Sequence, residues 1–238
     1  MAPGVLSMFS LEGKTAIVTG GTRGIGAGMA LGLAEAGADI VLVQRDESNT
    51  KTRDAIRALG RRADIYVAEL TDREAVKKII PEITKDTTRD FQILINCAGI
   101  QRRYPAEEFP DHEWDEVIHV NLSVVFTLSR DFAAYLLSKP APTTGRRGSI
   151  ISIGSLMTFQ GGKTVPAYSA AKGGVGQLTK AFANEWTAKG ITATSPKIKF
   201  VRSGGRSLPP PVAPQRSHGP CNRPQMAAAP RPPPPDIP

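Results

Sequence analysis

The sequence predicts an α/β protein built on a doubly wound parallel sheet. Two observations carry the prediction. Short β-branched runs alternate with longer stretches that have apolar residues at helical spacing, and the runs themselves are almost continuously apolar. Strands of this kind are buried on both faces, which requires helices above and below the sheet. The arrangement is Rossmann-like, so ligands are expected at the carboxyl ends of the strands.

Five strands and the helices between them follow from this pattern. The expected strands are residues 15–20 (TAIVTG), 39–44 (DIVLVQ), 64–70 (DIYVAEL), 91–99 (FQILINCAG) and 148–155 (GSIISIGS). Helical spacing is clearest at residues 26–37 (GAGMALGLAEAG) and 113–137 (EWDEVIHVNLSVVFTLSRDFAAYLL).

Composition divides the chain into two parts. Residues 194–238 hold 13 of the 20 prolines, and their seven Lys or Arg face one acid, Asp236. Most of the net charge of +8 therefore lies there. We expect one domain at residues 1–193, C-terminally incomplete, and a disordered Pro/Arg-rich, low-complexity tail of non-homologous sequence at 194–238. No basic face on the folded part favours nucleic acid as a partner.

The cysteines and the N-terminus predict a cytoplasmic protein. Cys97 and Cys221 cannot form a disulfide framework, and Cys97 lies in an apolar run that suits a reduced thiol. The first residues lack the basic and apolar regions of a signal peptide, and no apolar window approaches 18 residues. We expect no membrane partner and no metal site.

A glycine-rich turn follows the first expected strand. Residues 19–26 (TGGTRGIG) place Gly20, Gly24 and Gly26 where the strand turns into a helix. Glycines permit the tight turn and let a pyrophosphate approach the backbone, and the helix N-terminus offers unpaired N–H groups. A ligand-free Gly-rich turn is the alternative, because such turns are common.

A second motif, at residues 155–172 (SLMTFQGGKTVPAYSAAK), predicts acid–base chemistry. Tyr168 and Lys172 are four residues apart on a helix and share a face. An ammonium about 4 Å from the hydroxyl stabilises the tyrosinate by roughly 4 kcal/mol, or about three pKa units. Ser155 lies just past a strand and could donate to the same substrate oxygen. The alternative is a surface pair, which the joint occurrence of the three features disfavours.

These motifs, with NCAG (96–99), VNL (120–122) and ISIGS (151–155), resemble the short-chain dehydrogenase/reductase superfamily over residues 9–193. The resemblance implies hydride transfer between a nicotinamide cofactor and an alcohol or carbonyl. It implies Tyr168 as the catalytic acid/base, Lys172 as the residue that holds the ribose and lowers the tyrosine pKa, and Ser155 as the residue that orients the substrate. Asn121 would hold a proton-relay water; without the other motifs it would be taken for a helix-interior residue bonded to nearby backbone.

The same resemblance implies a set of cofactor-binding residues. They are Gly20, Thr22, Arg23, Gly24, Ile25, Gly26, Arg45, Glu69, Leu70, Asn96, Ala98, Gly99, Tyr168 and Lys172. Asn96 corresponds to the family's sheet-stabilising Asn, and Glu69 stands where the family usually has an Asp contacting the adenine.

The end of the second strand favours NADP(H). An NAD enzyme usually places an acid there for the ribose hydroxyls, whereas a 2′-phosphate needs a cation. This sequence has Gln44 in that place, with Arg45 beside it and Arg23 in the Gly-rich turn. Asp46 leaves NAD(H) open, and solvated loop arginines are the alternative reading.

A closer resemblance indicates the substrate. FSLEGK (9–14), GMALGLAEAG (28–37), RRYPAEEFPDHEWDEVIHVNL (102–122), FQGG (159–162) and ANEW (183–186) resemble the 2-deoxy-D-gluconate 3-dehydrogenase branch, also described as acting on 2-keto-3-deoxygluconate. The substrate would be a sugar acid bound at Ser155 and Tyr168. Its carboxylate needs a cationic seat, for which Arg102 and Arg103 are candidates, although a solvated loop pair is as plausible.

The family pattern is lost after residues 190–200 (GITATSPKIKF). Relatives continue with a Pro-Gly turn, a helix over the substrate and a seventh strand. Three explanations compete: an enzyme with a divergent tail, a polyproline interaction tail, and a frame change or retained intron. The last is favoured and would give an inactive truncated product that at most binds a dinucleotide. Relatives form homo-oligomers, partly through the C-terminal strand, so assembly stays open.

Overall fold

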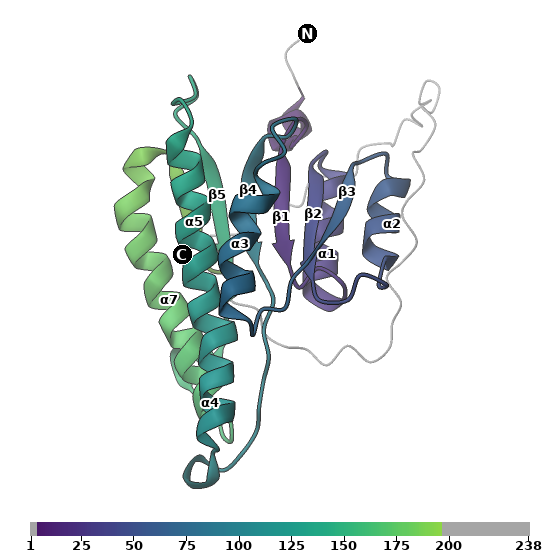
Figure 1. The fold of residues 1–238 in the computed structure, drawn as a ribbon. Coiled ribbons are helices and arrows are strands. Elements are labelled where there is room, and N and C mark those ends of the chain that lie inside the picture. The colour runs from purple at the N-terminus through teal and green to yellow at the C-terminus, as the bar shows by residue number, and fades with distance from the viewer. Residues whose placement is uncertain (1–3, 197–238) are drawn as a thin grey trace, which may run out of the picture. The chain divides into compact units, whose positions relative to one another are not determined.

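The computed structural model describes residues 4–196 and contains one six-stranded parallel sheet in the order β3-β2-β1-β4-β5-β6. The strands are β1 (Thr15–Thr19), β2 (Asp39–Gln44), β3 (Ala63–Val67), β4 (Phe91–Asn96), β5 (Gly148–Ser152) and β6 (Ile191–Thr194). Figure 1 shows β1 between β2 and β4. The doubly wound, Rossmann-like prediction is confirmed, and the chain reverses its winding direction between β1 and β4.

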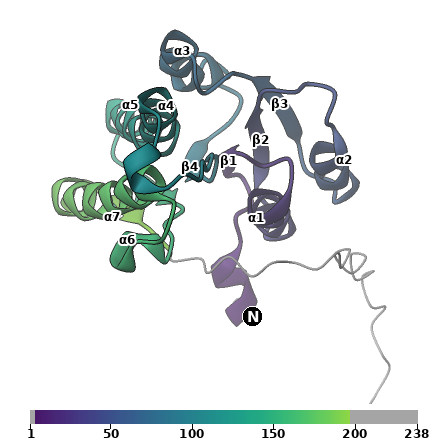
Figure 2. The same cartoon turned by 90° about the horizontal axis from the view of Figure 1, so that it is seen from below.

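Helices cover both faces of the sheet. They are α1 (Gly24–Glu35), α2 (Lys51–Ala58), α3 (Arg73–Ile83), α4 (Asp111–Ile118), α5 (Val124–Ser138), α6 (Met157–Gln160) and α7 (Pro166–Trp186). Short 3-10 turns span Val5–Phe9, Ala106–Glu108 and Thr187–Lys189. Figure 2 shows α1 and α2 on one side, with α3, α5 and α7 on the other.

Two hydrophobic cores result, one on each face. On the α1 side, small residues such as Ala30 and Ala34 pack against Ile40 and Leu42, so this helix lies close to the sheet. On the α5 side the core side chains are larger, and Phe132 is fully buried among them. All five residues of β1 are buried, because this strand is central and covered on both sides.

A π-helical turn, His119–Ser123, joins α4 and α5 into one continuous helical stretch. The stretch Asp111–Ser138 is long and apolar enough to cross a membrane by length and composition alone. Half of its most apolar window is buried inside the fold, as is usual for the core helix of a globular domain. Single π-turns often occur at functional sites, and this one carries Asn121.

The last described strand ends at Thr194 and pairs with β5, and the backbone N–H of Gly154 donates to the carbonyl of Pro196 at 3.0 Å. The chain is therefore ordered three residues past the expected boundary at 193. Among residues 4–196, β6 has a strand neighbour on one side only. The expectations for the tail from residue 197 onward lie outside the described residues, and the division into domains stays a prediction.

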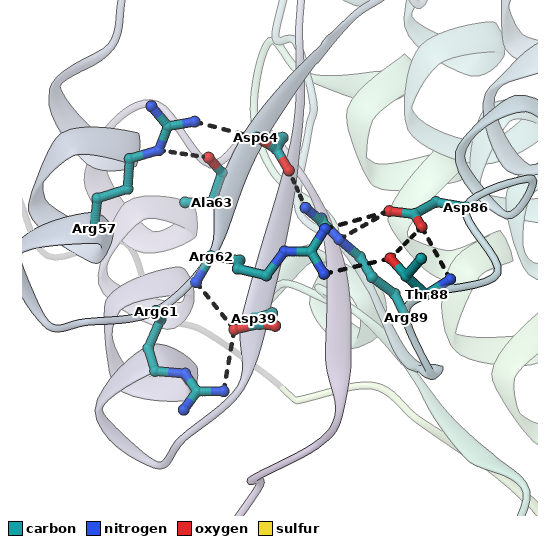
Figure 3. A network of polar contacts seen from close by, with 9 residues as sticks. All are labelled: Asp39, Arg57, Arg61, Arg62, Ala63, Asp64, Asp86, Thr88 and Arg89. Carbon is teal, nitrogen blue, oxygen red and sulfur yellow. Dashed lines mark hydrogen bonds and ion pairs between the residues drawn. The ribbon is translucent and has the colours of Figure 1, made fainter.

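A network of arginines and aspartates ties the amino ends of the strands together, at the edge of the sheet opposite the Gly-rich turn (Figure 3). It consists of Asp39, Arg57, Arg61, Arg62, Asp64, Asp86 and Arg89. Arg89 lies at its centre with a side chain only 5% exposed, and it contacts both Asp64 and Asp86. The network thereby fixes β3 to the loop that precedes β4.

Replacing the central arginine should destabilise the fold more than replacing a peripheral one. We expect Arg89→Ala to lower the free energy of unfolding by about 1–2 kcal/mol, since it removes a buried side chain and its contacts with Asp64 and Asp86, although each of these exposed carboxylates keeps a second arginine. Arg57→Ala is the control, because Arg57 is half exposed and its loss should cost below about 1 kcal/mol. Urea denaturation of both variants measures the difference, and equal effects would contradict the central role of Arg89.

Candidate active site

The Gly-rich turn has the backbone that a phosphate site needs. Gly20 and Gly24 have positive φ angles of 69° and 56°. A Cβ on Gly20 would lie 2.8 Å from the Cα of Ala98, and one on Gly26 would collide with the carbonyl oxygen of Gly20. Helix α1 begins at Gly24 without a side-chain cap, so its first N–H groups remain available to an anion. These residues fit a dinucleotide pyrophosphate.

The other residues of the turn lie beside this anion seat. Ile25, in the first turn of α1, is exposed, and so is Arg23, the residue that precedes α1. The carbonyl of Thr22 accepts a hydrogen bond of 3.3 Å from the hydroxyl of Thr52 in α2. The Gly-rich turn is thus tied to the helix that follows β2.

The carboxyl ends of β1 and β4 are joined through Thr19, a residue that the sequence analysis did not single out. Its hydroxyl oxygen accepts hydrogen bonds of 3.1 Å from the backbone N–H groups of Cys97 and Ala98. These bonds hold the segment Ala98–Gly99 against the Gly-rich turn. A threonine that ends a buried strand was the available signal, but strand threonines are too common to be singled out.

Asn96 links β4 to two neighbouring elements. It is 3% exposed, and its Nδ2 donates to the hydroxyls of Ser129 in α5 and Ser152 in β5 at 3.1 and 3.2 Å. Its Oδ1 is buried without a partner among the described residues. The position agrees with a side chain that stabilises the sheet beneath the cofactor site.

Asn121 clamps the loop between β4 and α4. Its Nδ2 donates to the carbonyl of Ile100 at 2.8 Å, and its Oδ1 accepts from the N–H of the same residue at 2.9 Å. A Cβ on Gly99 would lie 2.6 Å from this Oδ1. The Asn121 side chain is fully buried, and both its oxygen and its nitrogen are hydrogen-bonded to the backbone of Ile100. A role of Asn121 in holding water stays a prediction.

The structure brings Ser155, Tyr168 and Lys172 together. Ser155 follows β5, whereas the other two lie on the first turns of α7. A side-chain hydrogen bond connects Ser155 and Tyr168. Lys172 is only 4% exposed, its Nζ donates to the carbonyl of Ile153 at 2.6 Å, and the same Nζ lies 5.7 Å from the centre of the Tyr168 ring.

The expected lowering of the Tyr168 pKa by Lys172 is wrong for this structure. Burial raises the pKa of Tyr168, and the hydrogen bond from Ser155 offsets only part of that rise. Burial lowers the pKa of Lys172 to about 8. The physical cause is burial, which disfavours the charged form of both groups, while the ammonium of Lys172 donates to the carbonyl of Ile153.

Thr158 is a second residue that sequence reasoning missed. Its hydroxyl donates to the carbonyl of Lys172 at 3.1 Å and accepts from the N–H of Ser155 at 3.2 Å. It therefore fixes the distance between the segment after β5 and the helix that carries Tyr168. A hydroxyl three residues after Ser155 was the only sequence signal.

The end of β2 is followed by one arginine, Arg45, and by two exposed acids, Asp46 and Glu47. The Nε2 of buried Gln44 donates to the carbonyls of Asp46 and Asn49 at 2.5 and 3.0 Å, which folds the turn after the strand. The Asp46 carboxylate accepts from the N–H and hydroxyl of Ser48, which lowers its pKa. Arg45 is exposed, and it forms no salt bridge within residues 4–196.

The expected adenine-side residues follow β3. Glu69 is exposed, and its carboxylate accepts from the N–H of Thr71 at 3.1 Å. Leu70 is partly buried and packs against the core on the α5 side. Both lie past the end of β3, which stops at Val67, so they belong to a loop and not to the strand that the sequence predicted.

The two candidate arginines for a substrate carboxylate differ in their partners. Arg102 forms ion pairs with Glu113 and Glu116 of α4, and these raise its pKa. An anionic substrate would have to displace both glutamates. Arg103 forms no ion pair with any described carboxylate, and its Nη1 donates to the hydroxyl of Thr164 at 3.4 Å. Arg103 is therefore the better candidate of the two.

The family model "short chain dehydrogenase" matches residues 14–204. This chain belongs to the short chain dehydrogenase family. The match includes every site residue described above. It also extends past residue 193, where the resemblance found in the sequence ends.

Several relatives of this short chain dehydrogenase are named as sugar-acid dehydrogenases, and one, from Rhizobium johnstonii, is named as a galactitol 2-dehydrogenase. The chain is 45% identical over 193 residues to a 2-dehydro-3-deoxy-D-gluconate 5-dehydrogenase of Pseudoalteromonas atlantica, covering 80% of this chain and 73% of the relative. It is 37% identical to a gluconate 5-dehydrogenase of Gluconobacter oxydans, over 77% of this chain and 70% of the relative. The family and these names support an NAD(P)-dependent oxidoreductase that acts on sugar acids.

A solved structure agrees with the fold of this short chain dehydrogenase. The crystal structure of a gluconate 5-dehydrogenase from Burkholderia cenocepacia, in complex with NADP and tartrate, matches it with a TM-score of 0.75 and 34% identity. The match covers 83% of this chain and 75% of that structure.

Burial of Lys172 gives the stability of this short chain dehydrogenase a pH dependence. The unfolded chain keeps the Lys172 proton up to a pKa of about 10.4, whereas the folded chain loses it at about 8. Stability therefore rises with pH between these values, and below pH 8 the charged lysine costs on the order of 3 kcal/mol.

We expect Lys172→Met to raise the free energy of unfolding at pH 7 by about 1–3 kcal/mol and to flatten its rise between pH 8 and 9.5. Urea denaturation at several pH values, without cofactor, measures both effects. Lys180→Met is the matched control, because Lys180 lies exposed on the same helix. An unchanged pH slope in Lys172→Met would contradict the burial argument.

Proposed function

We propose that this chain is an NADP(H)-dependent oxidoreductase that interconverts a secondary alcohol and a ketone on a deoxy sugar acid such as 2-deoxy-D-gluconate or 2-dehydro-3-deoxy-D-gluconate. The observation that carries the proposal is the convergence of Ser155, Tyr168 and Lys172 beside an uncapped, glycine-lined helix N-terminus. These groups come from different elements of the fold. A chance pair of Tyr and Lys on the surface of one helix would not be accompanied by the serine and the glycine-lined helix N-terminus.

Tyr168 exchanges the proton of the reacting oxygen in this proposal. In the direction of oxidation it takes the hydroxyl proton while the substrate carbon gives up hydride, and in the direction of reduction it returns that proton to the carbonyl oxygen. A nicotinamide cofactor, when bound, would supply the hydride acceptor or donor. Ser155 holds the same oxygen through its hydroxyl. A raised Tyr168 pKa favours the protonated phenol at neutral pH, which is the form that the reduction requires. The oxidation requires the deprotonated phenol, so its rate should increase as pH rises.

Lys172 and Asn121 serve the cofactor and the proton path. The Lys172 ammonium is held beside Tyr168 and is the group that would bind the nicotinamide ribose. Asn121 secures the loop after β4, so that Ala98 and Gly99 line the cofactor site. The water that the family resemblance assigns to Asn121 would then connect Lys172 to the solvent.

A sugar acid is supported by the names of the relatives and by one cation. The relatives named above act on gluconate or a deoxygluconate, and the Burkholderia structure binds a hydroxy acid, tartrate, as well as NADP. In this chain Arg103 is the loop arginine without a carboxylate partner among the described residues. We propose Arg103, and not Arg102, as the seat of the substrate carboxylate.

A second candidate is a chain that binds NADP(H) without turnover. The observation that favours it is the segment after residue 204, where the family match ends, because this segment is rich in proline and arginine. Translation of the DNA beyond the codon for Thr192 in the other two frames tests its origin. A cytoplasmic location and the oligomeric state stay predictions.

Turnover separates these two candidates. The wild-type chain should reduce NADP+ with 2-deoxy-D-gluconate, and Tyr168→Phe should lower kcat/KM by roughly 10²–10⁴-fold because it removes the proton carrier. Tyr135→Phe is the control. The Tyr135 ring packs against Phe91 at the start of β4, whereas Ser155 follows the end of β5, at the opposite edge of the sheet. Absorbance at the NADPH band measures both. Binding of NADPH without turnover of any sugar acid would sink the oxidoreductase proposal and favour the second candidate.

Cofactor choice rests on the arginines beside the 2′-phosphate seat. We expect NADPH to bind more tightly than NADH, and Arg45→Ala to weaken NADPH binding by about tenfold while NADH changes by less than about twofold. Titration of NADPH fluorescence measures this without any need for turnover. Arg130→Ala, on the exposed face of α5, is the control. A wild-type preference for NADH would overturn the assignment.

A further inference from the structure

Thr164 has the most unusual backbone in the described part of the chain. It is the one non-glycine residue among residues 4–196 with a positive φ, at 62°. A β-branched residue in this region is strained, and such strain persists only where surrounding contacts hold it. Thr164 lies in the loop between α6 and α7, four residues before Tyr168.

Two loops meet at this residue. The carbonyl of Thr164 accepts a hydrogen bond of 3.1 Å from the backbone N–H of Tyr104, in the loop between β4 and α4. The hydroxyl of Thr164 accepts from Arg103 Nη1 at 3.4 Å and donates to the carbonyl of Lys163 at 2.6 Å. Two acceptors of Thr164, its carbonyl and its hydroxyl oxygen, therefore form the bridge between the loops.

The far side of the β4–α4 loop is fixed to α4. Arg102 pairs there with Glu113 and Glu116. The ring of Tyr104 packs edge-to-face on Phe109 with centroids 5.4 Å apart, and its hydroxyl donates to Glu113 at 3.3 Å. The loop is therefore held to α4 by ion pairs and a ring contact, and Thr164 joins it to the segment that leads into the Tyr168 helix.

We propose that Thr164 is a positioning residue for substrate specificity. Its strained conformation aims the carbonyl and the hydroxyl at the β4–α4 loop and so holds Arg103 at a fixed place relative to Tyr168. A sugar acid whose reacting carbon lies at Ser155 and Tyr168 then has its carboxylate seated on the Arg103 guanidinium. This inference rests on the proposed function, because it names the group that sets the preference for an acid.

The kinetic test compares 2-deoxy-D-gluconate with its uncharged amide. We expect the wild-type KM for the acid to be at least about tenfold lower than that for the amide. Thr164→Val keeps the β-branched shape and removes the hydroxyl, so it should reduce this ratio to about threefold or less while kcat changes by less than about twofold. Thr164→Ser keeps the hydroxyl and should retain the wild-type ratio. A full ratio in Thr164→Val, or an equal loss in both variants, would overturn the proposal.

Hydrogen exchange tests the bridge without turnover. Exchange of the Tyr104 amide in the full chain should become faster in Thr164→Gly, because glycine relieves the strain that aims the carbonyl, and it should stay at the wild-type rate in Thr164→Ser. An unchanged rate in Thr164→Gly would overturn the positioning role. NADPH binding by each variant confirms that it is folded. If the wild type turns over neither acid nor amide, the proposed function fails, and the exchange rates still decide whether Thr164 holds the loop.

Discussion

The close approach between the carboxyl ends of β1 and β4 is the constraint on which the site depends. The hydroxyl of Thr19 holds two backbone N–H groups of the neighbouring strand end, and Gly20 lies so near Ala98 that no side chain fits between them. This contact leaves the N-terminus of α1 at the point where the winding direction of the sheet reverses, which is where ligands bind in open α/β sheets. A Cβ at Gly26 would push the helix off the strand and close that seat.

Several polar groups of the candidate site are buried inside the fold. Lys172 is almost fully buried and has a lowered pKa, and Asn96 Oδ1 and Gln44 Oε1 have no partner within residues 4–196. Such groups cost stability, and in enzymes they often occur where a ligand is held. The two apolar cores on either side of the sheet offset that cost, and the Arg–Asp network at the opposite edge connects β3 to the loop before β4.

Sequence patterns predicted much of the fold and of the site. Apolar runs located five strands, because a central parallel strand must be buried on both faces. Spacing of four residues on a helix placed Tyr168 and Lys172 on one face. The direction of the Lys172 ammonium did not follow from spacing, since it is set by the carbonyl of Ile153, which belongs to another element. Adjacent Arg102 and Arg103 are indistinguishable in sequence, yet only Arg102 meets two glutamates.

The sequence by itself determined the order of the elements, the glycines that a phosphate seat requires, and the presence of Ser155, Tyr168 and Lys172, because each depends on local geometry or on a short spacing. Only the tertiary structure decided the direction of the pKa shifts of Tyr168 and Lys172, the different partners of the two arginines, and the contacts of Thr19, Thr158 and Thr164. The physical reason is that burial and hydrogen bonding depend on residues brought close by the sheet, such as Thr19 and Ala98, whose separation along the chain carries no signal.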